Sequence, residues 1–127
     1  MNNNLKFSYL GKQPYQDTYK DMKKHIQNFS SNQIWMLEHD AVFTLGTAAD
    51  ESHIINSGQI PVIQTDRGGE VTYHGPGQLV IYFLIDIKEI KLGPKALVQK
   101  LQELISSILG HYCLLYTSDA ADDRLRV

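Results

Sequence analysis

The sequence has little cysteine, little excess charge and no long apolar run. Its 127 residues contain one cysteine, Cys113, which excludes an internal disulfide framework and a cysteine-rich zinc site. The formal net charge is −2 without a basic patch, so nothing favours nucleic acid or an anionic membrane as a partner. No apolar segment is long enough to span a bilayer, and the N-terminus lacks a signal-peptide pattern. We therefore expect one soluble, cytoplasmic domain.

Motifs for common cofactors are also missing. The phosphate-loop pattern is absent, and Gly68-Gly69 lacks the third glycine of a dinucleotide-binding fingerprint. The five histidines show no metal-ligand spacing. His39 and His74 each follow a strand-like segment, and we expect that they could converge in space.

Hydrophobic periodicity predicts two helices and several strands. Apolar residues recur at steps of four and three from 14 to 29, and a wider stripe, broad enough to cover a sheet face, runs from 95 to 109. The strand-like segments are 6–10, which Gly11 should end, 33–39, 41–46, 60–64 and 78–86. Polar flanks and an uninterrupted apolar core predict 78–86 as a central strand, whereas Pro61 favours an edge position. Helices and strands do not alternate regularly, so we expect an α+β fold, a mixed β-sheet flanked by α-helices.

What the sequence does contain is a glycine-rich stretch, residues 66–78, in which four of the nine glycines fall within ten positions. One interpretation is a hairpin turn followed by a second turn at 75–77. The other is a cradle for a ligand: glycines let the backbone approach it closely, and Arg67 adds a planar, permanently charged donor. Thr72, Tyr73 and His74 would add hydrogen-bonding groups at alternating orientations. The apolar run that begins at Leu79 would form an apolar wall of the site. Such a site suits a small ligand with an apolar body and a polar head.

The segment Arg67–Gln78, followed by Tyr82, resembles the signature of the octanoyltransferases, also called lipoyl(octanoyl) transferases. The similarity extends over roughly residues 5 to 110. It includes Leu10-Gly11 with Tyr15, Trp35–His39, Val42–Gly46, Ile60–Val62 leading to Asp66, and Lys91–Gly93.

This resemblance implies the fold of the biotin and lipoate protein ligase catalytic domain, here truncated. It implies transfer of an octanoyl group from octanoyl-acyl carrier protein to a lysine of lipoyl domains, those of 2-oxoacid dehydrogenases and the glycine cleavage H protein. A cysteine thiolate would form an acyl-enzyme with the help of a lysine. Neither metal nor ATP is required, because the thioester is already activated. The implied substrate-binding residues are Arg67, Gly68, Gly69, Glu70, Val71, Thr72, Tyr73 and His74.

The C-terminal part departs from the family pattern. In the family the catalytic lysine and cysteine lie well after the second helix, whereas the resemblance here ends at about Tyr112. Residues 1–112 then form a partial domain, and 113–127 a non-native read-through tail, since 113–122 resembles a translated sequencing adapter. We therefore expect no catalytic residue in the chain, an incidental Cys113, and apolar surface left uncovered by the truncation. Two alternatives remain open: an ATP-dependent lipoate or biotin ligase relative, and a non-catalytic acyl-binding fragment.

Overall fold

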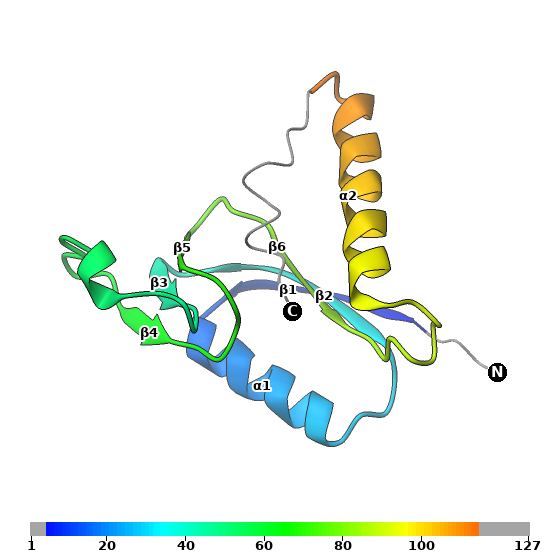
Figure 1. Ribbon diagram of the computed structural model, residues 1–127, viewed down its shortest axis with the longest axis horizontal. Coiled ribbons are helices and arrows are strands. Elements are labelled where there is room, and N and C mark those ends of the chain that lie inside the picture. Colours follow the sequence, from blue (N-terminus) through cyan, green and yellow to red (C-terminus); the bar gives the residue numbers. More distant parts are fainter. Residues whose placement is uncertain (1–4, 115–127) are drawn as a thin grey trace.

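The computed structural model describes residues 5–114, so the predicted tail lies outside it except for its first two residues. Figure 1 shows the arrangement of the elements along the chain. In order they are β1 (Lys6–Gln13), α1 (Tyr15–Gln27), β2 (Gln33–His39), β3 (Val42–Leu45), the 3-10 helix η1 (Glu51–His53), β4 (Val62–Gln64), β5 (Val71–His74), β6 (Val80–Leu84) and α2 (Pro94–His111).

The described strands form two three-stranded sheets. In the first, the order is β1-β2-β6, with β1 parallel and β6 antiparallel to β2. In the second, the order is β4-β3-β5, with β4 parallel and β5 antiparallel to β3. Both sheets are therefore mixed, and together with the two helices they confirm the predicted α+β class. Pro61 immediately precedes β4, which lies at a sheet edge as predicted.

Helix α1 covers one face of the first sheet. The ring of His25 lies 6.1 Å from that of Trp35, and Tyr15 lies 5.2 Å from His39. Under this helix Leu37 is fully buried and Leu84 is 7% exposed. The core of the described residues therefore lies between α1 and the β1-β2-β6 sheet and continues into β3, where Val42, Thr44 and Leu45 are buried.

The opposite face of that sheet is open to solvent. Phe7 pairs with Ile34, and Tyr9 with Met36, so these side chains share the face turned away from Trp35. Phe7 is 61% exposed and Tyr9 67% exposed. No described element covers them.

Helix α2 does not cover this face, contrary to the prediction from its apolar stripe. Figure 1 shows α2 projecting from the end of the sheet, on the side away from α1. None of its residues is buried, and Leu104, Ile105 and Ile108 are 41–54% exposed. The apolar stripe predicted the helix correctly but not its packing, because an amphipathic pattern does not identify the surface that the apolar face of the helix contacts. Neither described helix combines the length and hydropathy needed to cross a membrane.

Two strand predictions are also wrong in detail. β6 was expected at the centre of the sheet, yet among the described strands it pairs only with β2 and lies at the edge. Gly11 was expected to end β1. Instead it takes a positive φ of 67° inside the strand, where the register with β2 shifts between Tyr9 and Lys12. A glycine that adopts this conformation without strain lets the strand continue past the irregularity.

Candidate functional site

The glycine-rich stretch folds as a loop, a short strand and a turn. Residues 66–70 form the loop, and Val71–His74 form β5. The N–H of Gln78 donates to the carbonyl of Gly75 at 3.2 Å, and Gly77 has a φ of 88°. Pro76 followed by a glycine with positive φ is the pattern of a type II turn. The predicted turn at 75–77 is therefore present, whereas the strand between it and the loop was not predicted.

The Arg67 guanidinium is directed at the protein backbone. Its Nη2 donates to the carbonyl oxygens of Thr44 and Glu70, both at 2.9 Å, and to the Thr44 hydroxyl at 2.8 Å. Its Nη1 donates to the carbonyl oxygen of Gly68 at 2.9 Å. Four of its donor contacts thus hold the loop in place, and any contact with a ligand would be additional to this role.

Gly46, at the end of β3, allows the loop to approach closely. Its N–H donates to Glu70 at 3.2 Å, and the N–H of Ala48 donates to Gly69 at 3.2 Å. A Cβ at Gly46 would overlap the carbonyl oxygen of Gly69 and lie 2.9 Å from Nη1 of Arg67. Gly69 itself has a φ of 93°. The sequence prediction treated Gly46 only as the end of a strand, because the need for a small residue depends on a segment more than twenty positions away.

Strand β5 divides the other predicted site residues between two faces. Tyr73 pairs with Phe43, and their rings lie 5.3 Å apart on one face. Thr72 pairs with Thr44, and His74 occupies the same face two residues on. The loop residues Gly68 and Gly69 are half-buried, and Glu70, whose carboxylate lies 3.4 Å from His53, is exposed. The eight predicted residues are thus consecutive in sequence, but their side chains do not all face the same site.

The face that carries His74 meets a cluster of rings from three other elements. His74 lies nearly parallel to Tyr15, at 6.3 Å and 11°, and 5.8 Å from His39. His39 in turn contacts Tyr82, at 5.8 Å between ring centres. The sequence-based expectation that His39 and His74 could converge is therefore confirmed. The sequence placed Tyr15 in the apolar stripe of the first helix and Tyr82 in the strand-like segment 78–86, and both belong to the resemblance, but their contacts with the histidines were not predicted.

Burial favours the uncharged forms of His39, Tyr15 and Tyr82 in this cluster. His39 is fully buried, and desolvation lowers the pKa of its imidazole, with a further lowering from nearby His74. Burial also raises the pKa of the Tyr82 hydroxyl and of the Tyr15 hydroxyl above their usual range, although the charge of Arg67 opposes both shifts. At neutral pH His39, Tyr15 and Tyr82 therefore offer hydrogen bonds and aromatic surface rather than charge.

Asp66, which precedes the loop, is tied to α1. The hydroxyl of Tyr19 donates to its Oδ1, and Nζ of Lys23 lies 3.4 Å from its Oδ2 and 4.7 Å from the centre of the Tyr19 ring. The hydrogen bond from Tyr19 is the largest cause that lowers the pKa of the Asp66 carboxyl; desolvation opposes it, and the hydrogen bond and charge of Lys23 lower the pKa further. The loop is thus held by α1 on one side and by β3 on the other.

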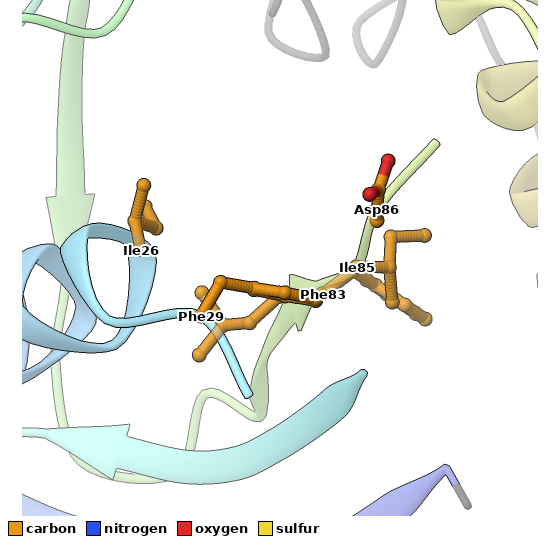
Figure 2. Close-up of a pocket in the computed structure, with 6 residues that line it drawn as sticks. Ile26, Phe29, Phe83, Ile85 and Asp86 are labelled. Atoms are coloured by element: carbon orange, nitrogen blue, oxygen red, sulfur yellow. The ribbon is translucent and has the colours of Figure 1, made fainter. Parts of the chain in front are cut away.

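Two pockets lie at opposite ends of α1. One, of about 260 Å³, adjoins the ring cluster, because Tyr15 of the cluster lines it together with Pro14, Gln16, Asp40, Ala41, Val42, Pro61 and Ile63. The other, of about 390 Å³, lies where α1 ends and β6 ends. Figure 2 shows Ile26, Phe29, Phe83 and Ile85 around it, with the Asp86 carboxylate turned away from the apolar rings. No residue of the 67–74 segment lines either pocket.

Cys113 does not belong to the site. It is exposed, lies just after α2 with a φ of 59°, and its N–H donates to Gly110 at 3.0 Å. No ion pair or side-chain hydrogen bond joins it to a described residue that could activate a thiol. Within residues 5–114 no three histidine, cysteine, aspartate or glutamate side chains lie close enough together to hold a metal ion.

The chain thus combines two mixed sheets and two helices with a glycine-rich loop that is hydrogen-bonded to the neighbouring strand β3. The family model of the lipoyl protein ligase A/B catalytic domain matches residues 16–119. The chain belongs to this family, which confirms the fold inferred from the resemblance.

Within this family, the chain is similar to curated octanoyltransferases. The octanoyltransferase of Shewanella halifaxensis is 48% identical over 113 residues, which cover 87% of this chain and 52% of the relative. The octanoyltransferase of Vibrio cholerae serotype O1 is 45% identical over 115 residues, 88% of this chain and 53% of the relative. The chain therefore spans about half the length of the curated relatives it matches.

Proposed function

We propose that this chain carries the acyl-binding part of an octanoyltransferase, which moves an octanoyl group from octanoyl-acyl carrier protein to a lysine of a lipoyl domain. The observation that carries the proposal is the 45–48% identity to proteins named octanoyltransferase. A continuous match that covers 87% of the chain necessarily includes the 67–74 segment.

The geometry of the segment supports an acyl-binding role. The loop is rigidly held by Arg67 and Asp66, so its backbone is preorganised rather than disordered before a ligand arrives. Next to it Tyr73 is 46% exposed, with Phe43 behind its ring, which offers apolar contact to a hydrocarbon chain. Thr72 and His74 lie on the opposite face of β5, so they would contact the polar head of the ligand rather than line the same wall as Tyr73. Apolar contact together with a few fixed polar groups is the usual make-up of a site for a ligand of this kind.

In the proposed reaction a cysteine thiolate attacks the thioester carbon of the donor and expels the carrier thiol. The acceptor lysine amine then attacks the new thioester and forms an amide, so that the cysteine thiol is regenerated. A second lysine would lower the pKa of the cysteine thiol and accept the proton. We propose that both groups belong to the part of the relatives that this chain does not match, that Cys113 is not the nucleophile, and that the chain alone binds without catalysing. The domain boundary at residue 112 stays a prediction.

A chimaera tests this proposal. Residues 1–112 of this chain would replace the matching half of the Shewanella halifaxensis octanoyltransferase, and transfer from octanoyl-acyl carrier protein to a lipoyl domain would be followed by mass spectrometry. We expect octanoylated lipoyl domain, and the same product when Cys113 is included and changed to serine. A folded chimaera that transfers nothing, or an octanoyl adduct on Cys113 in the unfused chain, would contradict the proposal.

One observation favours the ligase alternative: the matching family model is that of the lipoyl protein ligase A/B catalytic domain. A ligase activates a free acid with ATP. Turnover of free octanoate by the chimaera only in the presence of ATP would therefore favour the alternative, whereas ATP-independent turnover of the thioester would favour the transferase.

A further inference from the structure

His39 is held by two hydrogen bonds that determine where its proton lies. Its Nδ1 is 2.9 Å from the backbone oxygen of Gln13, and its Nε2 is 2.8 Å from the hydroxyl oxygen of Tyr82. A backbone oxygen can only accept, so Nδ1 carries the proton. In the neutral ring Nε2 then accepts, and the Tyr82 hydroxyl donates to it. The burial described above favours this neutral form.

His74 is held in a similar way from a different direction. Its Nδ1 is 2.6 Å from Oε1 of Gln78, so the proton again lies on Nδ1. One side of its ring packs against Tyr15, and its neighbour across the cluster is His39. Among residues 5–114, the Nε2 of His74 has no hydrogen-bond partner. Both ring nitrogens of His39 and the Nδ1 of His74 are already engaged, so within the cluster only this Nε2 can still accept a proton or a hydrogen bond.

The four rings come from elements distant in sequence, so the pair formed by His39 and Tyr82 acts as a brace. Tyr82 lies in β6, His39 ends β2, and Gln13 ends β1 just before Tyr15 begins α1. The hydrogen bonds therefore fix the entry of α1 relative to β6, and Tyr15 transmits this position to His74. The energy of a ring contact of this type depends on both distance and tilt, so a shift of the Tyr15 ring would alter the packing of the His74 ring.

We propose that His39 and Tyr82 are positioning residues that hold the His74 imidazole as the Nδ1-protonated tautomer, with its free Nε2 available to the acyl group or the incoming amine. This inference rests on the proposed function for the identity of that ligand. Its structural part, the coupling of Tyr82 to His74 through His39 and Tyr15, does not depend on it.

Nitrogen-15 NMR of the histidine side chains in the full 127-residue chain tests the coupling. In the unmodified chain we expect both His39 and His74 to be Nδ1-protonated at pH 7.5. We expect Tyr82→Phe to alter the imidazole nitrogen shifts of His39 and also those of His74, which Tyr82 does not contact. The matched control Tyr9→Phe, at an exposed position on the open sheet face, should change neither.

Two results would overturn the inference. One is an Nε2-protonated His39 in the unmodified chain, a measurement that needs no variant to fold. The other is a Tyr82→Phe chain that keeps its circular dichroism spectrum and leaves His74 unchanged.

A second arm uses an octanoyl-pantetheine thioester as the probe and measures its affinity by titration calorimetry. We expect Tyr82→Phe to weaken binding about tenfold, the effect expected for one misplaced hydrogen-bonding group, and Tyr9→Phe to leave it unchanged. If Tyr82→Phe alters the His74 nitrogen shifts as predicted but the unmodified chain does not bind the probe, the proposed function fails while the positioning network stands. If it binds the probe and Tyr82→Phe binds equally well, the proposed function stands and the positioning role fails.

Discussion

The Arg67 guanidinium donates to both the backbone oxygen and the hydroxyl of Thr44, at 2.9 and 2.8 Å. Thr44 is fully buried in β3, so the most polar residue of the glycine-rich segment is anchored in the core. The position of the loop therefore depends on a charged side chain that reaches inward. Arg67, which the sequence predicted as a ligand contact, therefore also supports the loop, and this structural role can be tested.

Arg67→Lys should lower the free energy of unfolding by about 2 kcal/mol, because an ammonium cannot reproduce the planar fork that reaches three carbonyl oxygens and a hydroxyl. Urea unfolding at pH 7 measures the loss. The reverse exchange at an exposed position of α1, Lys20→Arg, should change stability by less than about 0.5 kcal/mol. Equal effects of the two exchanges would show that Arg67 does not support the loop.

Gly46→Ala should destabilise the chain by about 1–3 kcal/mol, since the added Cβ would overlap the backbone oxygen of Gly69. Backbone atoms cannot rotate aside as a flexible side chain can. Gly110→Ala is the control: nothing lies within 4 Å of its added Cβ, and it lies in α2, so alanine should be neutral or stabilise by up to about 1 kcal/mol. Thermal unfolding of both variants gives the comparison, and a tolerated Gly46→Ala would mean that the loop is not packed as described.

Stability should fall as the pH drops from about 7 to 5. Burial lowers the pKa of His39 below 6.5, its ordinary value in the unfolded chain, so in this window the unfolded state binds a proton that the folded state does not. The contribution of His39 is therefore complete above pH 6.5 and decreases as the pH falls toward its folded pKa. His39→Gln should flatten the dependence of the unfolding free energy on pH between 7 and 5. An unchanged slope in this variant would show that another group is responsible.

Tyr19→Phe should raise the pKa of the Asp66 carboxyl toward its ordinary value, because the bond from Tyr19 is the largest cause of its lowering. Carbon-13 NMR of the carboxyl group, titrated from pH 2 to 6, measures this directly. Lys23→Gln should raise the same pKa by a smaller amount. A larger effect of the lysine exchange would indicate that the ion pair, rather than the hydrogen bond, holds Asp66.

The elements were predictable from sequence where local pattern alone determines them. The stripe from Tyr15 and the apolar runs of β2 and β6 gave helix and strands at nearly the observed bounds, since periodicity depends only on neighbouring residues. β5 was missed because a four-residue strand between glycine-rich segments has too few positions to show a period. Its pairing with β3 supplies the hydrogen bonds that make it a strand.

Long-range relationships were harder to predict. Which face of a helix becomes buried depends on what lies opposite, and for α2 nothing described lies there. The need for glycine at 46, and the inward turn of Arg67, follow from contacts between β3 and a loop about twenty residues later. The convergence of His39 and His74 could be anticipated from their places after strand-like segments, whereas the brace formed with Tyr82 required the sheet register.

The central claim is that the segment from Arg67 to His74 binds an acyl chain, and photolabelling tests it most directly. An octanoyl thioester with a diazirine at the end of its chain would be bound to the 127-residue chain, irradiated, and located by peptide mass spectrometry. We predict labels within residues 67–78 and at Phe43, which lies against Tyr73. Labels confined to Ile26, Phe29 and Phe83, which line the pocket at the C-terminal end of α1, would contradict the account.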